Sequence, residues 1–566
     1  MAARQQAIPH LAVRGTKGLH VIDGKTNFER PEDVVCDPVQ NCRCFKFSKD
    51  GCLFAWCNSQ SLQVVDLKTS QKLFEIPKQK TSLLSFSSCG NYLCTWEGYY
   101  TTPDNPKGFN NLEILRVGDG STVKSFVQKR QDTWEPQWSN DELLCARCVN
   151  NEVHFYENRD FSSVSKKLFQ QNVTNFSLAP GPSPYKIAIF VKGTKAAPSF
   201  VRLFQYPNLE GRQALANRSF FKADKIEMFW NKKGTCVLVL SSTEVDTTGA
   251  SYYGEQTLHF ISIKGEANLV PFDKKGPVYS VDWNPNSAEF CVIYGYMPAK
   301  AKIFNNKCEP IFDFGTGPRN LCFYNSHGSI LCLAGFGNLR GVMELWNTKE
   351  KKLISKPQAS DSTHFEWAPD GLHFVTATTS PRLKIGNGYK IWHYTGNVIH
   401  ECAYEQGHEL YQVDWQPVSD GVYKEFAIIS VSKPLNAPAK VEAYRPPSAR
   451  ATGKQGIKLH EDEPAQNAKQ AELSGAALKN KKKREAKVKQ SEPSHQIPAS
   501  TQQQQAAGAP MTENEKKIKN LKKKLRQIEE LKQKQKEGKT LEKNQLDKIK
   551  VEKELVLEIR ELELDS

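Results

Sequence analysis

The 566-residue sequence predicts an all-β fold, a large β-propeller, followed by a basic, mostly disordered linker and a C-terminal α-helical segment. Three observations support this fold class. Bulky aromatic residues, each followed by a short turn cluster, recur between residues 47 and 415. Short apolar runs broken by Gly, Asn, Asp and Ser fill the intervals. Tyr444 is the last aromatic residue, so the remainder cannot bury a comparable core. We therefore divide the chain into a propeller (1–445), a linker (446–511) and a helical segment (512–566).

The aromatic recurrence predicts the number of blades. A period of about 40–45 residues with one aromatic signature per unit is typical of propeller blades. Nine anchors predict nine blades, and eight is the alternative because the unit around Phe176 is irregular. A propeller usually serves as a recognition platform, which favours binding over chemistry. The anchors are Phe47, Phe86, Trp138, Phe176, Trp230, Trp283, Phe323, Trp367 and Trp415.

Between the anchors, the pattern indicates short strands. Residues 53–56 and 62–67 form apolar runs separated by a Ser-Gln-Ser turn, and similar pairs follow most anchors. Runs of four to six apolar residues bounded by turn formers are strand and hairpin signals. No stretch before residue 446 sustains a helical period, so we expect strands throughout the propeller.

The two ends of the propeller are expected to close the ring in one blade. Residues 10–14 and 18–23 read as strands near the N-terminus, and residues 411–415 and 425–429 read as strands at the far end. Pairing them would remove the sheet edges that invite aggregation. Deletion of the first residues should therefore destabilise the whole ring.

Three long insertions interrupt the blade pattern, at residues 99–111, 192–199 and 244–256. Insertions in repeat proteins map to loops on a face of the molecule, which is often the binding face. Tolerated surface loops are the alternative interpretation.

The linker contains a dense basic cluster with one acid, Glu485. Such a cluster suits salt-dependent contact with the RNA backbone, and the lack of aromatic residues excludes base stacking. A nuclear-import signal and a merely solvated run are the alternatives. The cations are Lys479, Lys481, Lys482, Lys483, Arg484, Lys487 and Lys489.

The C-terminal segment predicts two amphipathic helices. Residues 512–515 match a capping box, T-x-x-E, and residues 538–540 separate the two helices. Apolar residues at helical spacing form a narrow stripe on each helix, which must be covered by its neighbour, another copy or a partner protein. The stripe residues are Ile518, Leu521, Leu525, Ile528, Leu546, Ile549, Leu555, Ile559 and Leu562.

No motif indicates an enzyme, a cofactor or a metal site. The sequence lacks a nucleophile elbow, a phosphate-binding G-x-x-x-x-G-K-[ST] loop and an H-E-x-x-H motif. Cys145 and Cys148 have C-x-x-C spacing but lie in a strand-like run without a second pair, so we expect no metal. The odd number of cysteines and the absence of a secretory signal or of an apolar run of about 18 residues favour a cytoplasmic protein with no membrane contact.

A resemblance to a known family is carried by the openings Trp283-Asn284-Pro285, 367–371 and Trp415-Gln416-Pro417, and by segments 333–339 and 388–392. The resemblance is to the eukaryotic translation initiation factor 2A family. It runs along essentially the whole chain, including the lysine-rich tail. The b subunit of initiation factor 3 has a similar propeller, but also an RNA-recognition domain that this chain lacks.

The resemblance implies a factor that binds the small ribosomal subunit and promotes delivery of initiator methionyl-tRNA without its own GTPase, at non-standard or stress-linked starts. Messenger RNA and, through the C-terminal helices, another initiation factor are further implied partners. The net charge of +15 agrees with an anionic partner. The alternative function is a cytosolic propeller scaffold for protein–protein assembly with no direct RNA role.

Overall fold

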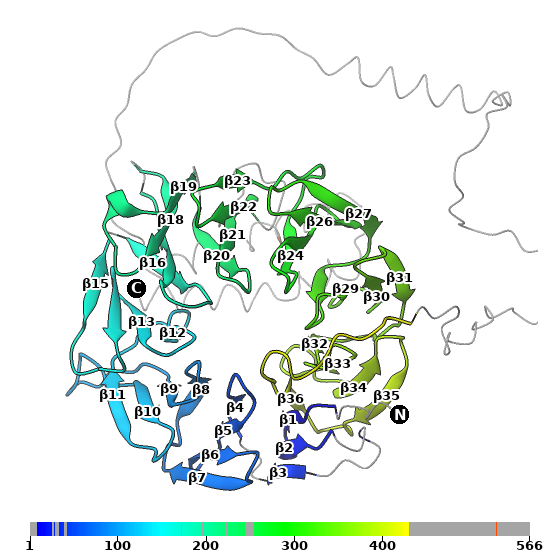
Figure 1. Cartoon of the computed structure of the whole chain (residues 1–566). Coiled ribbons are helices and arrows are strands. Elements are labelled where there is room, and N and C mark those ends of the chain that lie inside the picture. The colour runs from blue at the N-terminus through cyan, green and yellow to red at the C-terminus, as the bar shows by residue number, and fades with distance from the viewer. Residues whose placement is uncertain are drawn as a thin grey trace, which may run out of the picture. The chain divides into compact units, whose positions relative to one another are not determined.

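The first unit of the chain is a nine-bladed β-propeller (Figure 1). The computed structural model describes residues 8–24, 28, 33–38, 42–170, 172–194, 197–220, 223–243, 254–429 and 528. The chain divides into two compact units, Met1–Tyr444 and Arg445–Ser566. Nine antiparallel four-stranded sheets surround a central axis in the first unit. The nine-bladed prediction is therefore confirmed, and the eight-bladed alternative is wrong.

Each blade runs from an innermost strand at the axis to an outermost strand at the perimeter. One 3₁₀ turn, η1 (Gly211–Gln213), lies between two strands of the blade that starts with β16. The closing blade contains β36 (Leu410–Trp415), β1 (Leu11–Gly15), β2 (Gly18–Ile22) and β3 (Asp33–Asp37), from inside to outside. The other eight blades follow chain order: β4 (Cys44–Phe47), β5 (Leu53–Cys57), β6 (Leu62–Asp66), β7 (Gln71–Ile76); β8 (Thr81–Phe86), β9 (Tyr92–Glu97), β10 (Leu112–Arg116), β11 (Thr122–Phe126); β12 (Gln137–Trp138), β13 (Leu144–Val149), β14 (Glu152–Glu157), β15 (Lys166–Phe169); β16 (Val173–Leu178), β17 (Lys186–Val191), β18 (Ser199–Gln205), β19 (Ala216–Phe220); β20 (Lys225–Trp230), β21 (Cys236–Ser242), β22 (Gln256–Ser262), β23 (Ala267–Leu269); β24 (Val278–Trp283), β25 (Glu289–Tyr294), β26 (Ala299–Asn305), β27 (Pro310–Gly317); β28 (Leu321–Tyr324), β29 (Ile330–Ala334), β30 (Met343–Asn347), β31 (Lys352–Ser355); and β32 (His364–Trp367), β33 (His373–Thr378), β34 (Gly388–His393), β35 (Val398–Ala403).

The aromatic anchors all lie at or near the end of an innermost strand, one in each blade. Three of the tryptophans donate their indole N–H to a backbone carbonyl of the preceding blade. Trp283 Nε1 lies 2.8 Å from the Phe229 oxygen, and Trp367 Nε1 lies 3.1 Å from the Phe323 oxygen. In the closing blade, Trp415 Nε1 donates to the Glu366 oxygen at 3.3 Å. A large ring with one polar handle therefore fills a blade junction and satisfies a strand carbonyl.

The hydrophobic core lies between neighbouring blades. A typical cluster joins Ala12 and Leu19 of the closing blade to Phe45 and Phe54 of the next. The middle strands of a blade are covered on both faces by neighbouring blades. Strand β29, with the sequence Ile-Leu-Cys-Leu-Ala, is accordingly buried along its entire length. This burial explains why many strands read as continuous apolar runs instead of alternating.

The ring closes by pairing the two ends of the propeller. Strand β1 pairs antiparallel with β36, with Leu11 opposite Trp415 and Val13 opposite Val413. The first part of the closure prediction is thus confirmed. The predicted strand at 425–429 is wrong, because β3 already occupies the outermost position of the closing blade by pairing with β2. Residues Phe426 and Ile428 instead pack against a core cluster of other blades, so their apolar character reflects burial without strand pairing.

Candidate nucleic-acid interface

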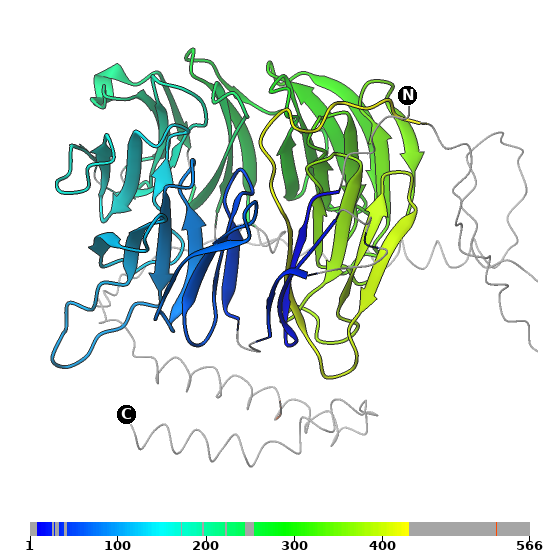
Figure 2. The ribbon, with the colours of Figure 1, turned by 60° about the horizontal axis from the view of Figure 1, so that its bottom comes forward.

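The antiparallel blades create two distinct faces (Figure 2). One face carries the connections between the first and second strands and between the third and fourth strands of each blade, and we call it the turn face. The opposite face carries the connections between the second and third strands and between successive blades, and we call it the loop face. Because successive strands run in opposite directions, each type of connection emerges on the same face in every blade.

The turn face is built from one tight turn that repeats in seven blades. The residue that opens the turn donates its backbone N–H to the carbonyl of the residue that starts the next strand. Its own carbonyl accepts the backbone N–H of the last turn residue, three positions further along the chain. This last residue has a φ between +58° and +81°, which favours glycine. The recurrent aromatic-turn-glycine pattern in the sequence reflects this geometry. The residues are Gly51, Gly90, Glu142, Gly234, Ser287, Gly328 and Gly371.

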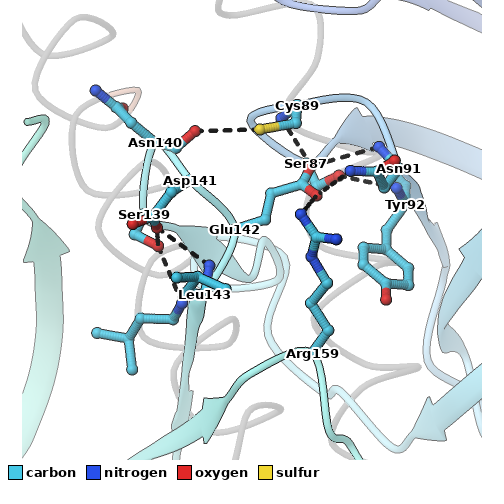
Figure 3. Close-up of polar contacts among 11 residues, drawn as sticks. Ser87, Cys89, Asn91, Tyr92, Ser139, Asn140, Asp141, Glu142, Leu143 and Arg159 are labelled. Atoms are coloured by element: carbon cyan, nitrogen blue, oxygen red, sulfur yellow. Dashed lines mark hydrogen bonds and ion pairs between the residues drawn. The ribbon is translucent and has the colours of Figure 1, made fainter. Parts of the chain in front are cut away.

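Glu142 replaces glycine at this position and uses its side chain to join two blades (Figure 3). Its carboxylate is fully buried and accepts hydrogen bonds from the Cys89 backbone N–H and from Asn91 Nδ2, both at 2.7 Å. Arg159 lies 3.8 Å from the same carboxylate. Buried carboxylates need such compensation, and these donors from the preceding blade supply it. This site therefore stabilises the junction.

Ser287 is the other residue that replaces glycine at this turn position, and its side chain also joins two blades. Its hydroxyl accepts a hydrogen bond from the Lys233 backbone N–H of the preceding blade at 3.2 Å. Two asparagine side chains that open turns donate to the next blade: Asn284 Nδ2 to the Gly328 oxygen at 3.1 Å and Asn325 Nδ2 to the Gly371 oxygen at 3.0 Å. The turn face is thus a set of mutually bonded turns with a structural role.

The innermost strands also carry carboxylates that bridge blades. Asp282 Oδ2 accepts the Tyr324 backbone N–H at 2.7 Å, and burial raises the pKa of Asp282 to about 7. Glu366 Oε2 accepts the Trp415 backbone N–H at 3.0 Å, and burial raises the pKa of this carboxyl.

One group of side chains in the described part of the chain has ligand atoms near enough to share a metal ion. These atoms, from His364, Glu366 and Asp414, lie within 4.8 Å of one another. Glu366 bridges two blades, as above, and Asp414 accepts a bond from Gln412 at 2.8 Å. Both carboxylates therefore have a structural role, and we assign no metal to them.

The C-x-x-C pair cannot act as one chelating unit. Cys145 and Cys148 are both buried in β13, but their side chains belong to core clusters on opposite faces of the sheet. All fifteen cysteines are free thiols.

All three sequence insertions lie between a second and a third strand, and the described strand ends that flank them are on the loop face. They follow β9, β17 and β21. Residues 195–196 and 244–253 of the second and third insertions lie outside the described residues. The first insertion, between β9 and β10, is described completely and is the blue loop that projects at the lower left of Figure 2.

This first insertion is closed by its own hydrogen bonds. Thr102 and Asn105 form an isolated β-bridge, and Asn105 Nδ2 donates to the Gly108 oxygen at 3.0 Å. Tyr99 donates its hydroxyl to the Lys107 oxygen at 3.3 Å, and its ring packs against Gly108. A Cβ on Gly108 would come within 2.3 Å of that ring, and φ is +83° there, so glycine is required.

The closed loop presents exposed rings beside lysines. The rings of Tyr100 and Phe109 stack with centroids 5.0 Å apart, and the two residues are 44% and 40% exposed. Lys80 Nζ lies 5.2 Å from the centroid of Tyr100, and Lys129 Nζ lies 5.3 Å from that of Tyr99. We call Tyr99, Tyr100, Phe109, Lys80, Lys107 and Lys129 the aromatic–lysine cluster.

Sequence reasoning noted the insertion but missed this cluster. The two adjacent tyrosines and Phe109 within one insertion were a readable signal. Lys80 and Lys129 come from the connections before β8 and after β11, and only the fold brings them to the loop.

The tail residues predicted from the sequence cannot be compared with the structure in the same way. All seven cations of the 479–489 cluster lie outside the described residues, as do the stripe residues except Ile528. Ile528 has helical backbone and is 4% exposed. The linker and helix predictions therefore stay predictions.

Among the described residues, no helix has the length and apolarity needed to cross a membrane.

Comparisons with known proteins agree with the fold. Residues 218–413 match the family model described as "Eukaryotic translation initiation factor eIF2A". The chain is 35% identical to eukaryotic translation initiation factor 2A of Drosophila melanogaster, with 99% of both chains covered. It is 24% identical to the b subunit of eukaryotic translation initiation factor 3 of Xenopus laevis, over 70% of this chain and 57% of that protein. A solved structure titled "Crystal structure of the eukaryotic initiation factor" superposes with a TM-score of 0.66 at 33% identity, covering 73% of this chain and all of that one. The chain therefore belongs to the eukaryotic translation initiation factor 2A family.

Proposed function

We propose that this chain is a cytoplasmic translation initiation factor that binds the small ribosomal subunit and promotes delivery of initiator methionyl-tRNA at non-standard or stress-linked starts. The observation that carries this proposal is the similarity to named initiation factors over nearly the entire chain. Family membership supports a role in initiation, and the stated step within initiation is our inference from the resemblance to that family.

The proposed role is binding without catalysis. A rigid ring with mutually bonded turns suits a docking platform. The sequence has no G-x-x-x-x-G-K-[ST] loop with which to hold the phosphates of GTP, so we assign tRNA delivery without a GTPase of its own.

The two units divide the work in this proposal. The propeller supplies shape-specific docking on RNA and protein. The basic cluster at 479–489 adds affinity for the phosphates of ribosomal, transfer or messenger RNA, which carries no sequence preference. The apolar stripes of the 512–566 segment bind another initiation factor.

Binding of the purified full-length protein to small ribosomal subunits, with and without initiator tRNA, tests the proposal across a salt series. A second protein carries serine in place of all seven cations of the basic cluster. We expect this variant to bind more weakly at low salt and with a shallower salt dependence, because it releases fewer counterions. Binding no stronger than that of an unrelated basic protein would favour the scaffold alternative.

A further inference from the structure

The aromatic–lysine cluster combines a stacked pair of exposed rings with three exposed lysines. Exposed aromatic rings are few in the propeller, and Tyr100 and Phe109 stack on each other at the surface instead of packing into a core. The three lysines around them are exposed, and none of them forms an ion pair within the part of the chain that the structure describes. Neighbouring cations differ: Lys78 pairs with Glu113 at 3.1 Å, and Arg130 pairs with Asp132.

We propose that the aromatic–lysine cluster is a binding site for single-stranded RNA. Unpaired bases stack on the Tyr100–Phe109 pair, and Lys80, Lys107 and Lys129 contact the adjoining phosphates. This inference rests on the proposed function, since it assigns to one loop of the propeller the RNA contact which that function needs.

The chemistry of the cluster fits this ligand. A nucleobase is planar and stacks favourably on an aromatic side chain, whatever its identity. Lys80 Nζ and Lys129 Nζ lie over the rings of Tyr100 and Tyr99, 5.2 and 5.3 Å from the ring centroids. Their long, exposed side chains can therefore reach the phosphates of a strand whose bases stack on the neighbouring ring surface. An acidic peptide would use the lysines but leave the rings without a planar partner.

The geometry favours unpaired over paired RNA. Bases in an A-form duplex stack on each other, and their faces are inaccessible to a protein ring. The rings here stand on a loop on the loop face, where a single strand can reach them. The hydrogen bonds that close the loop hold the rings in place before binding, so little ordering cost remains.

The test measures binding of a short fluorescent oligouridine, and of an RNA duplex, to the full-length protein over a range of salt concentrations. The aromatic variant is Tyr100→Ala/Phe109→Ala, and its rescue partner is Tyr100→Trp/Phe109→Tyr. We expect the aromatic variant to bind oligouridine roughly tenfold more weakly at every salt concentration, because stacking is not screened by ions. The rescue variant should bind as the wild type does, and duplex affinity should not change.

The lysine variant, Lys80→Ala/Lys129→Ala, should show a different signature. Removing two phosphate contacts should lower the slope of log affinity against log salt by about 1.4 for a single strand. Two controls change equivalent residues elsewhere. Phe169→Ala removes a phenylalanine that is 69% exposed on β15, and Lys264→Ala/Lys307→Ala removes exposed lysines from turns of the turn face. Neither control should alter oligouridine affinity by as much, and all variants should keep the wild-type melting temperature.

Unchanged oligouridine affinity in the aromatic variant would overturn this inference alone, provided that the wild type still binds small ribosomal subunits. Equal weakening of duplex and single-strand binding would overturn the stacking role. If the aromatic variant keeps its oligouridine affinity but no longer binds a purified ribosomal protein, the cluster recognises protein and not RNA. Failure of the wild type to bind ribosomal subunits, initiator tRNA and oligouridine would remove the proposed function together with this site.

Discussion

Single side chains in this propeller act across the junctions between blades. Glu142, Ser287 and Asp282 each bind a backbone N–H group of a neighbouring blade. Glu142 and Ser287 are buried and Asp282 is partly buried, so substitution of these hydrogen-bonded residues should lower the stability of the ring.

Replacing Glu142 with alanine should destabilise the protein by about 2–3 kcal/mol, because two partly buried N–H donors, from Cys89 and Asn91, lose a charged acceptor. Glu142→Gly relieves the left-handed backbone but removes the same bonds, so it should recover only part of this loss. Thermal unfolding of the purified variants measures the effect. Glu210→Ala, which removes an exposed carboxylate, is the control and should leave the melting temperature unchanged.

Asp282 should make stability depend on pH. Its folded-state pKa of about 7 lies above the unfolded value, so the folded protein binds the proton more tightly. Stability from this group is complete below the unfolded pKa and is lost as the pH rises from about 4 to 7. Asp282→Asn keeps an acceptor for Tyr324 and removes the titration. We therefore expect the variant to melt higher than the wild type at pH 8 and to approach it at pH 4.

At pH 8 the free energy of unfolding of the variant should exceed that of the wild type by on the order of 1–2 kcal/mol. This is less than the free energy that corresponds to the whole difference between the folded and unfolded pKa values, because Asp282 is partly accessible to solvent. A difference between variant and wild type that stays constant from pH 4 to pH 8 would contradict the titration of Asp282.

At the scale of elements, the innermost strand and its turn form the repeated unit that holds blades together. Anchors differ in whether their indole N–H finds a partner across the junction. Trp283 Nε1 donates to the Phe229 carbonyl, whereas Trp230 Nε1 is buried without a hydrogen-bond partner in the described structure. The two residues therefore form a matched pair.

Trp283→Phe should cost about 1 kcal/mol more than Trp230→Phe, since it alone breaks a hydrogen bond and leaves a strand carbonyl unpaired. Both changes remove a similar ring volume, so the difference between their unfolding free energies isolates the bond. Denaturant unfolding of the two variants provides the measurement. Equal losses would show that the anchors act by ring packing only.

At the scale of the whole molecule, closure of the ring depends on the first strands of the chain. Strand β1 lies between β36 and β2, so it connects the end of the propeller to its beginning. Removing it would expose the edge of β36 and the apolar faces that pack on either side.

Deletion of residues 1–22 should therefore abolish the monomeric ring, with aggregation detected by size-exclusion chromatography and a broadened thermal transition. Deletion of residues 1–7 leaves every strand of the propeller in place and should melt as the full chain does. A sharp, unshifted transition after the longer deletion would contradict the role of β1 and β2 in closure.

The sequence by itself determined the nine blades, their anchors and the pairing of residues near 11–15 with those near 410–415, because each depends on a local pattern that repeats with the blade. It misplaced the last strand of the closing blade. Residues 425–429 and 33–37 are both apolar enough to pair, and only packing decides which segment occupies the edge.

The tertiary structure alone decided which residues meet across blades. Whether Glu142 reaches Asn91, or Lys80 and Lys129 reach the rings of the 99–111 insertion, depends on the radius of the ring and the alternation of strand direction. These quantities follow from the packing of all nine blades, and no short segment of the sequence contains them. The periodic pattern thus encodes the repeated unit, while the contacts between units, including the proposed RNA site, arise only when the ring is closed.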